Sequence, residues 1–270
     1  EEEEQQQQQQ QQHQYGTQCS FAITGPTLDG CGDSSSSDDH DKSRQQFYNS
    51  FIQECYSYYS QDTCTDIELQ RLAMNQRQPQ SMINMTTTGY HKVKAPDSLI
   101  QMLTDFWQEN KEKKELEEWS DGSIYTNHWK APTYMVNVED PYLEGGGHVL
   151  KTAIWDAALA GVEEWTTQGG EGSSEVKLRP VSLYGIREYT EGAILSPHVD
   201  RVPLVSSGIV NVAQDVDEPW PLEVYDRQGL AVNITMEPGD MILYESHSLI
   251  HGRPFPLRGR YYANVFIHFE

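Results

Sequence analysis

Residues 193–204 read AILSPHVDRVPL and place an imidazole and a carboxylate, one residue apart, inside an otherwise apolar run. Side chains two residues apart lie on the same face of a β-strand, so His198 and Asp200 are expected to project together. The pair is typical of half a metal site, but a surface aspartate beside a histidine that bonds elsewhere has the same pattern. A metal site therefore requires a third ligand from another part of the chain.

The residues around this stretch have the pattern of a β-sheet. Turn signals at 191–192, 226–229 and 237–240 separate short apolar runs, which predicts a sandwich or a barrel. The expected strands are 180–189, 193–199, 208–213, 222–225, 230–235, 241–244 and 260–269. Two helical patterns precede them, one starting at Pro96 and one over 148–166. We therefore expect an α+β fold that is mainly β, with supporting helices on its N-terminal side.

Composition divides the chain into three regions. Residues 1–45 begin with EEEEQQQQQQQQ, carry nine acidic and two basic side chains, and are expected to be a disordered low-complexity segment. Residues 46–94 contain two short helical patterns and are expected to form a small helical appendage. Residues 95–270 are expected to form the main domain, with its β core at 180–270.

The net charge of −22 argues against two classes of partner. Binding to nucleic acid or to an anionic membrane needs clustered Lys and Arg side chains, and this chain is strongly acidic. Its apolar runs also fall short of the roughly 18–20 residues that cross a bilayer. We expect no nucleic-acid partner and no direct membrane binding, and the sequence carries no signal for an oligomeric state.

All four cysteines lie in the first quarter of the chain, at Cys19, Cys31, Cys55 and Cys64. An even number in one region favours two disulfides, with three possible pairings, over a zinc cluster, because no C-x-x-C hook is present. Two Asn-x-Thr sequons, at Asn84 and Asn233, are compatible with a secretory route. We expect a location in the lumen of the endoplasmic reticulum or Golgi, or secretion, with a cytoplasmic location and free thiols as the alternative.

Two candidates for the third ligand, His247 and His251, stand in the stretch YESHSLIHGRP. His251 lies 53 residues after His198. Two histidines and one carboxylate, with the adjacent coordination positions open, form the facial triad of non-haem Fe(II) oxygenases. Arg260, nine residues after His251, starts the last expected strand and could point back into the barrel to bind a carboxylate bidentately. If His247 were the ligand instead, Arg258 would have to replace Arg260.

Four short motifs follow one another along the chain: HVD at 198–200, PGD at 238–240, LIH at 249–251 and GRY at 259–261. Together they resemble the Fe(II)/2-oxoglutarate-dependent dioxygenase superfamily, and the arrangement is most similar to the prolyl 4-hydroxylase catalytic domain. Tyr189, nine residues before His198, matches a tyrosine that helps to hold 2-oxoglutarate in that family. The resemblance covers roughly residues 180–270.

The resemblance implies a double-stranded β-helix, also called a jelly roll, and a set of site residues. His198, Asp200 and His251 would be the iron ligands, Arg260 the anchor of 2-oxoglutarate and Tyr189 a second contact to it. His247 would lie outside the ligand set, and no catalytic side chain is expected beyond the metal site. Fe(II), 2-oxoglutarate and dioxygen would be required, with ascorbate as reductant.

One motif of the family is absent from this chain, so the resemblance does not identify the substrate. Prolyl hydroxylases usually have a G-G-x-T-x-F stretch beside the active site, where this chain has DVDEPWPLEVY at 215–225. The first hypothesis is an oxidoreductase that hydroxylates a peptide or protein substrate, most simply at proline, with release of succinate and CO₂. The alternatives are a hydroxylase of a small molecule or lipid, and a jelly-roll binding module without catalytic activity.

Overall fold

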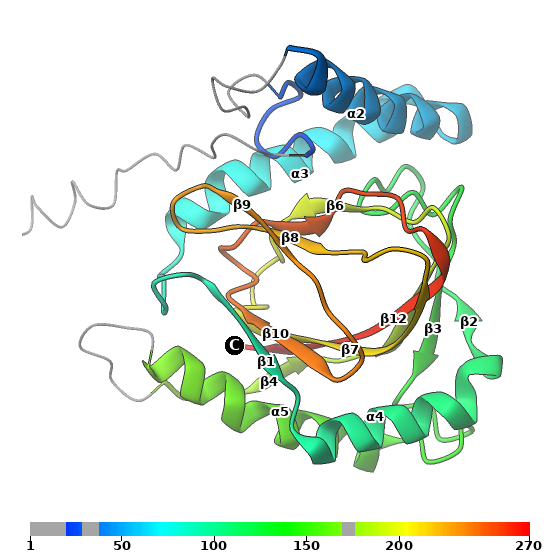
Figure 1. The fold of residues 1–270 in the computed structure, drawn as a ribbon, viewed down its shortest axis with the longest axis vertical. Coiled ribbons are helices and arrows are strands. Elements are labelled where there is room, and N and C mark those ends of the chain that lie inside the picture. Colours follow the sequence, from blue (N-terminus) through cyan, green and yellow to red (C-terminus); the bar gives the residue numbers. More distant parts are fainter. Residues whose placement is uncertain (1–19, 29–37, 169–175) are drawn as a thin grey trace, which may run out of the picture.

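Two antiparallel β-sheets form the centre of the structure, a computed structural model that describes residues 20–28, 38–168 and 176–270. The strands are β1 (Tyr90–Lys94), β2 (Glu115–Leu116), β3 (Thr133–Asn137), β4 (Pro180–Ser182), β5 (Gly185–Thr190), β6 (Leu195–His198), β7 (Ser206–Val216), β8 (Leu222–Tyr225), β9 (Ala231–Ile234), β10 (Asp240–Tyr244), β11 (His251–Arg253) and β12 (Gly259–Phe269). The large sheet has the order β1-β10-β7-β12-β5-β3-β2, with β4 paired to β12, and the small sheet has the order β6-β11-β8-β9. The two sheets face each other across the interior (Figure 1).

Helices α4 (Asp97–Asn110) and α5 (His148–Gln168) cover the outer face of the large sheet (Figure 1). Leu99 and Leu103 of α4, Ile154 of α5 and Val265 of β12 belong to one buried apolar cluster. Full burial of such a side chain stabilises the fold by about 2 kcal/mol. A short 3₁₀ turn, η1 (Lys111–Lys113), follows α4. The expected supporting helices are thus present, and the prediction of a mainly β fold with helices is confirmed.

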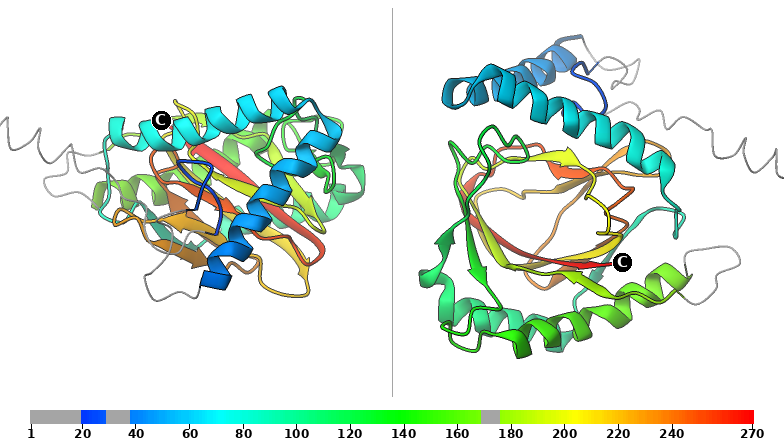
Figure 2. Two further views of the ribbon diagram at one scale, coloured as in Figure 1. Left: turned by 90° about the horizontal axis from the view of Figure 1, so that it is seen from above. Right: turned by 180° about the vertical axis from the view of Figure 1, so that it is seen from behind.

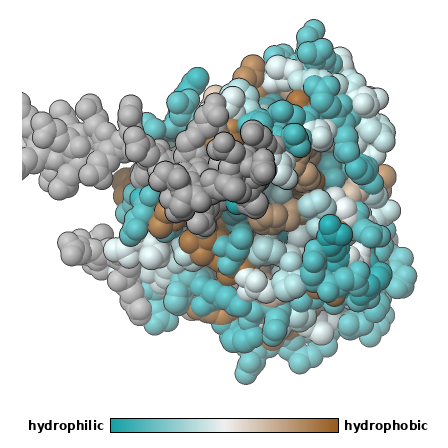
Figure 3. All heavy atoms as spheres, turned by 45° about the horizontal axis from the view of Figure 1, so that its top comes forward, coloured by the Kyte–Doolittle hydropathy of each residue, from teal (hydrophilic) through white to brown (hydrophobic). Residues whose placement is uncertain are grey.

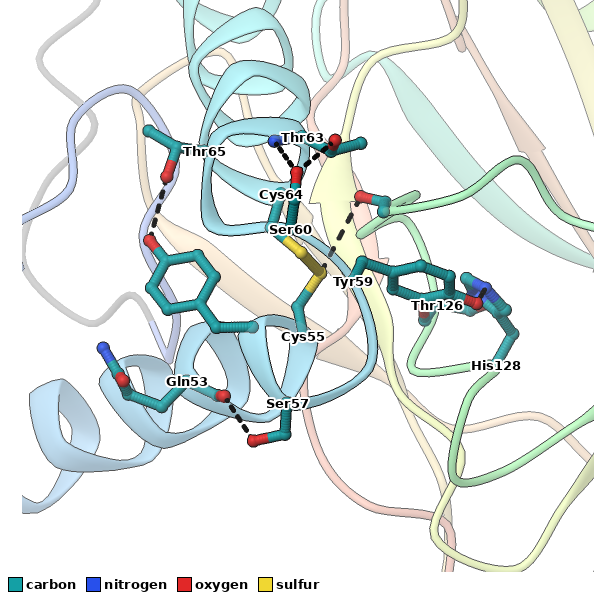
Figure 4. The surroundings of a disulfide bond; sticks show 12 residues. Gln53, Cys55, Ser57, Tyr59, Ser60, Thr63, Cys64, Thr65, Thr126 and His128 are labelled. Carbon is teal, nitrogen blue, oxygen red and sulfur yellow. Dashed lines mark hydrogen bonds between the residues drawn. A yellow bond between two sulfur atoms is a disulfide. The ribbon is translucent and has the colours of Figure 1, made fainter.

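Helices α2 (Asp38–Tyr58) and α3 (Gln61–Ser81) lie on the opposite side of the molecule, next to the small sheet (Figures 1 and 2). Ser60 caps α3, because its hydroxyl accepts a hydrogen bond from the Thr63 amide at 3.1 Å. A disulfide between the buried Cys55 and Cys64 joins the two helices (Figure 4). By restricting the unfolded chain, such a short cross-link contributes about 2–3 kcal/mol. The other two cysteines lie outside the described residues, so a second disulfide stays a prediction.

The structure corrects the expectation of a disordered segment that reaches residue 45. Phe21 and Ala22 are fully buried, and the ring of Phe21 packs edge-on against Tyr48 and Phe51 of α2. The helix α2 itself already begins at Asp38. The rest of the expected segment, 1–19 and 29–37, lies outside the described residues. The short stretch 20–28 therefore belongs to the core between the helices and the small sheet.

Four strands were not expected from the sequence. Three of them, β1, β2 and β3, extend the edges of the large sheet, so the expected boundary at residue 95 falls after a strand of the main sheet. The fourth, β11, spans only three residues and carries His251. Polar or very short strands lack an alternating apolar pattern, because neighbouring strands rather than side-chain burial define them.

The surface of the molecule is largely polar, as the charge of the chain requires. Hydrophilic residues cover much of the face in Figure 3, with smaller apolar areas between them. Among the residues that the structure describes, no helix has the length and apolar character needed to cross a membrane.

Candidate metal centre

The pairing of β6 with β11 brings the two expected histidine ligands together. These strands are antiparallel neighbours in the small sheet, and His198 lies directly opposite His251 in their register. Side chains at directly opposed positions share one face of a sheet. The two imidazole rings consequently lie with their centroids 4.6 Å apart.

Asp200 completes this group from the segment that follows β6. Its Oδ1 lies 3.5 Å from Nε2 of His198 and 4.0 Å from Nε2 of His251. One ligand atom from each of the three residues lies within 4.8 Å of the others. Two imidazole nitrogens and one carboxylate oxygen at this spacing suit a divalent transition metal and leave the opposite side of the ion open. The structure therefore brings His198, Asp200 and His251 together.

Backbone carbonyls fix the orientation of both imidazoles. Nδ1 of His198 lies 2.8 Å from the carbonyl oxygen of Ser196, and Nδ1 of His251 lies 2.9 Å from that of Leu249. A carbonyl oxygen only accepts hydrogen bonds, so each Nδ1 carries the proton and each Nε2 keeps its lone pair. Both Nε2 atoms face Asp200 in the state that binds a metal.

The electrostatics of the group keep its members in ligand form. Burial alone would raise the pKa of Asp200, but the contact with His198 and the nearby His251 and His268 hold that pKa well below its usual range. Burial, and next the neighbouring His198, lower the pKa of His251 to about 4. Near neutral pH the group thus contains a carboxylate and a neutral imidazole, the protonation states that metals require.

A cavity of about 550 Å³ opens beside the three residues. Its wall is largely aromatic and aliphatic, with Trp119, Tyr125, Met135, Tyr184, Leu195 and Phe266 among its members. Tyr184 is 64% exposed, so the cavity reaches the surface. A substrate could therefore approach the open side of the centre from solvent.

Two further histidines lie near the centre. His268 of β12 has its Nδ1 3.7 Å from the second carboxylate oxygen of Asp200 and 2.6 Å from the hydroxyl of Ser207. His268 was not among the site residues expected from the sequence, although its position on the last strand could have indicated a place near the centre. His247, the alternative ligand, is buried outside the group, and its Nδ1 lies 2.6 Å from the carbonyl oxygen of Val205.

The structure contradicts the expected position of Arg260. Its side chain is 55% exposed and forms ion pairs with Asp215 and Asp217, outside the cavity. The register of β12 against β7 shifts between Gly259 and Tyr261, and this irregularity at Arg260 turns its side chain outward although Tyr262, two residues on, is buried. Arg260 cannot contact a molecule beside His198 from this position.

Arg253, which the sequence analysis missed, lies in the interior instead. It stands two residues after His251 on β11. The register against β6 shifts between these two residues, because the four residues of β6 stand opposite the three of β11. Alternation along β11 itself turns both side chains to the same side. Its residue is 1% exposed, and its guanidinium lies 4.7 Å from the ring centre of Trp220 and 4.5 Å from that of Tyr262. It donates to the Trp220 carbonyl oxygen and to the Met236 sulfur. Within the described ranges no ion pair joins Arg253 to a carboxylate.

Burying a guanidinium without a counter-ion costs free energy, so an anion is the ligand that would best stabilise Arg253 in this position. The signal was present in the sequence, because the i, i+2 rule that links His198 to Asp200 also links His251 to Arg253.

Tyr189 lies in the same part of the interior as Arg253. It is fully buried, pairs with Tyr262 across β5 and β12, and packs against Trp220 at 5.1 Å. The hydroxyls of both tyrosines are buried. That of Tyr262 has no hydrogen-bond partner among the described residues, whereas that of Tyr189 interacts with Arg187. A buried arginine without a counter-ion and a buried hydroxyl without a partner are donors that match a carboxylate.

Arg187 of β5, which does line the cavity, is already neutralised. Its Nε donates to Glu117 at 2.7 Å and its Nη2 to the other oxygen of the same carboxylate. The guanidinium lies 5.3 Å from the ring centre of Trp119. Because the Glu117 carboxylate already neutralises this guanidinium through its Nε and Nη2 edge, Arg253 is the better candidate for binding an anion.

No protein-family model matches the sequence. No curated protein matches it either. Among solved structures, a Pseudomonas putida prolyl-4-hydroxylase matches with 13% identity and a TM-score of 0.41, over 68% of this chain and 93% of that one. A Trichoplax adhaerens prolyl hydroxylase, in complex with a hypoxia inducible factor peptide fragment, matches with 10% identity and a TM-score of 0.47, over 68% and 84%.

HygX from Streptomyces hygroscopicus, with nickel, 2-oxoglutarate and hygromycin B bound, matches with 11% identity and a TM-score of 0.47, over 68% of this chain and 83% of that one. Two prolyl hydroxylases and HygX are thus among the solved structures to which this chain is similar, all at 10–13% identity and with TM-scores of 0.41–0.47.

The metal centre can be tested by removing single imidazoles. We expect His198→Ala and His251→Ala each to weaken Ni²⁺ binding by roughly 100-fold or more, because each removes one of three ligands. His247→Ala, which removes a buried imidazole outside the group, should leave the affinity unchanged. Isothermal titration calorimetry measures all three, and equal losses in all variants would contradict the assignment.

Proposed function

We propose that the protein is an Fe(II)- and 2-oxoglutarate-dependent dioxygenase built on a double-stranded β-helix. The observation that carries the proposal is the group of His198, Asp200 and His251 beside an open cavity, with the unpaired Arg253 on the same strand as one ligand. A metal that activates dioxygen and a dicarboxylate that supplies electrons would each find a matching set of side chains. Dioxygen would be the second co-substrate, with ascorbate as reductant.

The fixed orientation of the two imidazole rings determines how the protein would bind iron. His198 and His251 would each offer Nε2, and Asp200 would offer Oδ1, without a change of tautomer. Bound iron would supply the activation of dioxygen that no side chain can provide. The second oxygen of Asp200 is buried without a hydrogen-bond partner within the described ranges, and it faces His268 at 3.7 Å. His268 would thus help to hold this carboxylate once the other oxygen is coordinated.

Arg253 would hold the far carboxylate of 2-oxoglutarate, with the hydroxyls of Tyr189 and Tyr262 as further donors. The guanidinium of Arg253 packs against the rings of Trp220 and Tyr262, and Tyr189 packs against the same tryptophan. These buried aromatic surroundings exclude water, which strengthens a charged hydrogen bond relative to the same bond in solvent. The near end of the molecule would then point along β11 towards His251. This assignment keeps the expected role of Tyr189 and replaces Arg260.

For the hydroxylated substrate we favour a peptide or protein, most simply at proline. The cavity reaches the surface and has aromatic walls, including Trp119 and Tyr125, against which a non-polar ring can pack. Trp220 is not part of this wall, because it lies deep beside Arg253, and Glu223 bonds Ser20 and Tyr225 instead. A small molecule of similar size is the alternative. A binding module without activity is disfavoured by the complete ligand set.

We also propose a lumenal or extracellular location, in keeping with the cysteine pattern. The Cys55–Cys64 disulfide is buried, and both sequon asparagines, Asn84 and Asn233, are exposed. Alkylating free thiols in a denaturing buffer at the moment of cell lysis should therefore leave Cys55 and Cys64 unlabelled until a reductant is added. Their labelling before reduction, detected by mass spectrometry, would favour the cytoplasmic alternative.

The activity is tested by incubating the full chain with Fe(II), 2-oxoglutarate, ascorbate and air, with and without proline-rich peptides. We expect succinate to form in proportion to a peptide that gains one oxygen atom. Stimulation by members of a small-molecule panel, with no effect of peptides, would favour the alternative substrate class. If iron-dependent succinate is absent under all of these conditions, the enzyme assignment is wrong.

The anchor is tested by the matched pair Arg253→Met and Arg260→Met. Loss of a charge-assisted carboxylate contact worth about 1.5–3 kcal/mol should raise the KM for 2-oxoglutarate roughly 10- to 100-fold in Arg253→Met. The same change should alter the melting temperature of the ligand-free protein little, since the loss of the contacts with Trp220 and Tyr262 is offset by the removal of an uncompensated buried charge. Arg260→Met should leave the KM unchanged; the reverse pattern would restore Arg260 as the anchor.

A further inference from the structure

We infer that Asn75 and Gln78 of helix α3 are positioning residues, which hold the backbone of the metal-binding segments in place from outside the barrel. The inference rests on the proposed metal centre. Neither residue contacts the cavity beside the metal centre. Each side-chain amide instead bonds the backbone next to a proposed ligand.

The need for such support follows from the sheet. Strand β6, which ends in His198, is an edge strand of the small sheet, with β11 on its other side. On the outer edge of β6 the segment at Tyr125 and Thr126 bridges only Leu195 and Ser196. The backbone groups that follow, on either side of His198, have no strand partner there among the described residues, and buried groups of this kind must find hydrogen bonds elsewhere. Helix α3 lies beside this edge (Figures 1 and 2). Its side chains take the place of the missing neighbouring strand.

Asn75 forms a clamp across His198. Its amide nitrogen donates to the carbonyl oxygen of Pro197 at 2.9 Å, and its amide oxygen accepts from the backbone N–H of Val199 at 3.0 Å. These are the backbone groups on either side of the ligand. The second amide hydrogen bonds the carbonyl oxygen of Ile23 at 2.9 Å, and the side chain is fully buried. Both donors of this buried amide are therefore used, which fixes its orientation.

Gln78, nearly one helical turn further along α3, joins the segments that carry different ligands. Its amide nitrogen donates to the carbonyl oxygens of Asp200 and His247, each at 2.6 Å. The first belongs to a proposed ligand, and the second lies four residues before His251. The amide of Asp200 also donates to the Ser246 carbonyl oxygen at 2.8 Å. Gln78 thus ties the Asp200 segment to the loop that leads into β11.

Arg71 anchors the same face of α3. It is fully buried, pairs with Glu68, and donates to the carbonyl oxygens of Pro197 and Ala22. Glu68 in turn accepts a hydrogen bond from the Tyr48 hydroxyl of α2 at 2.7 Å. Positions 71, 75 and 78 recur at helical spacing, so one face of α3 presents three polar side chains to the barrel. A packing helix normally turns an apolar face inward, so this polar face requires a specific partner.

The consequence concerns geometry at the metal. Removing a clamp should let the backbone around His198 and Asp200 move, which weakens binding and alters the ligand arrangement without removing a ligand. A rigid helix is well suited to this role, because side chains on regular elements hold a site more closely than loops do.

The test uses Co²⁺ in place of iron, with its visible absorption spectrum as the readout. Gln78→Met keeps the length of the side chain but removes both donated hydrogen bonds, and Gln80→Met makes the same change at an exposed position of the same helix. We expect Gln78→Met to weaken Co²⁺ binding on the order of tenfold and to change the band shape. Gln80→Met should match the wild-type affinity and spectrum. Gln78→Glu, which also lacks the donors, serves as a second variant if Gln78→Met does not fold.

The outcomes separate this inference from the proposed function. A wild-type protein that binds Co²⁺ through His198, with an unchanged affinity and spectrum in folded Gln78→Met, overturns the positioning role alone. A wild-type protein that does not bind Co²⁺, or whose binding survives His198→Ala, overturns the metal centre and the positioning role together. A weakened, spectrally altered Gln78→Met beside a normal Gln80→Met supports both.

Discussion

The pairing of β6 with β11 is the constraint on which the site depends. Its register sets His198 opposite His251, and Asp200 follows immediately after β6. A shift of one residue would turn one histidine to the other face of the sheet, because side chains alternate along a strand. The metal centre therefore depends on a strand pair of three and four residues, at one edge of the small sheet. So short a pair gains little stability by itself and relies on its surroundings.

Two unusual features of the interior are explained if the protein binds a metal and a charged ligand. Arg253 is a buried cation without a carboxylate in the described part of the chain, and it packs on the ring of Tyr262, whose buried hydroxyl also lacks a partner there. Helix α3 presents Arg71, Asn75 and Gln78 to the barrel, where apolar side chains would pack at lower cost. Both features cost stability in an isolated fold, and both are understandable if a charged ligand and a metal complete the interior.

The sequence allowed the metal ligands to be selected but not the arginine. Local alternation applies within a strand, so His198 and Asp200 could be paired from their spacing, and the family resemblance supplied His251. The direction of Arg260 depends on the register of β12 against its neighbours, and long-range pairing of this kind is not encoded in a local pattern. The same alternation rule would have indicated Arg253, but β11 is too short to be recognised as a strand from the sequence.

The contact between α3 and the β core could not be predicted from the sequence either. Its inward face is polar, so hydrophobic periodicity gave no sign that it contacts the β core. The ordered stretch around Phe21 was missed for a related reason, since it lies next to a polar, acidic segment and is held by helices distant in sequence. These contacts arise from tertiary structure alone.

The most direct test of the account is a crystal structure of the protein grown without oxygen, with Fe(II) and 2-oxoglutarate, and with diffraction data collected at the iron absorption edge. The account predicts one anomalous peak bound by Nε2 of His198, Nε2 of His251 and a carboxylate oxygen of Asp200. It also predicts a carboxylate of 2-oxoglutarate against the guanidinium of Arg253. Iron bound by other residues, or 2-oxoglutarate bound with Arg253 uninvolved, would contradict it.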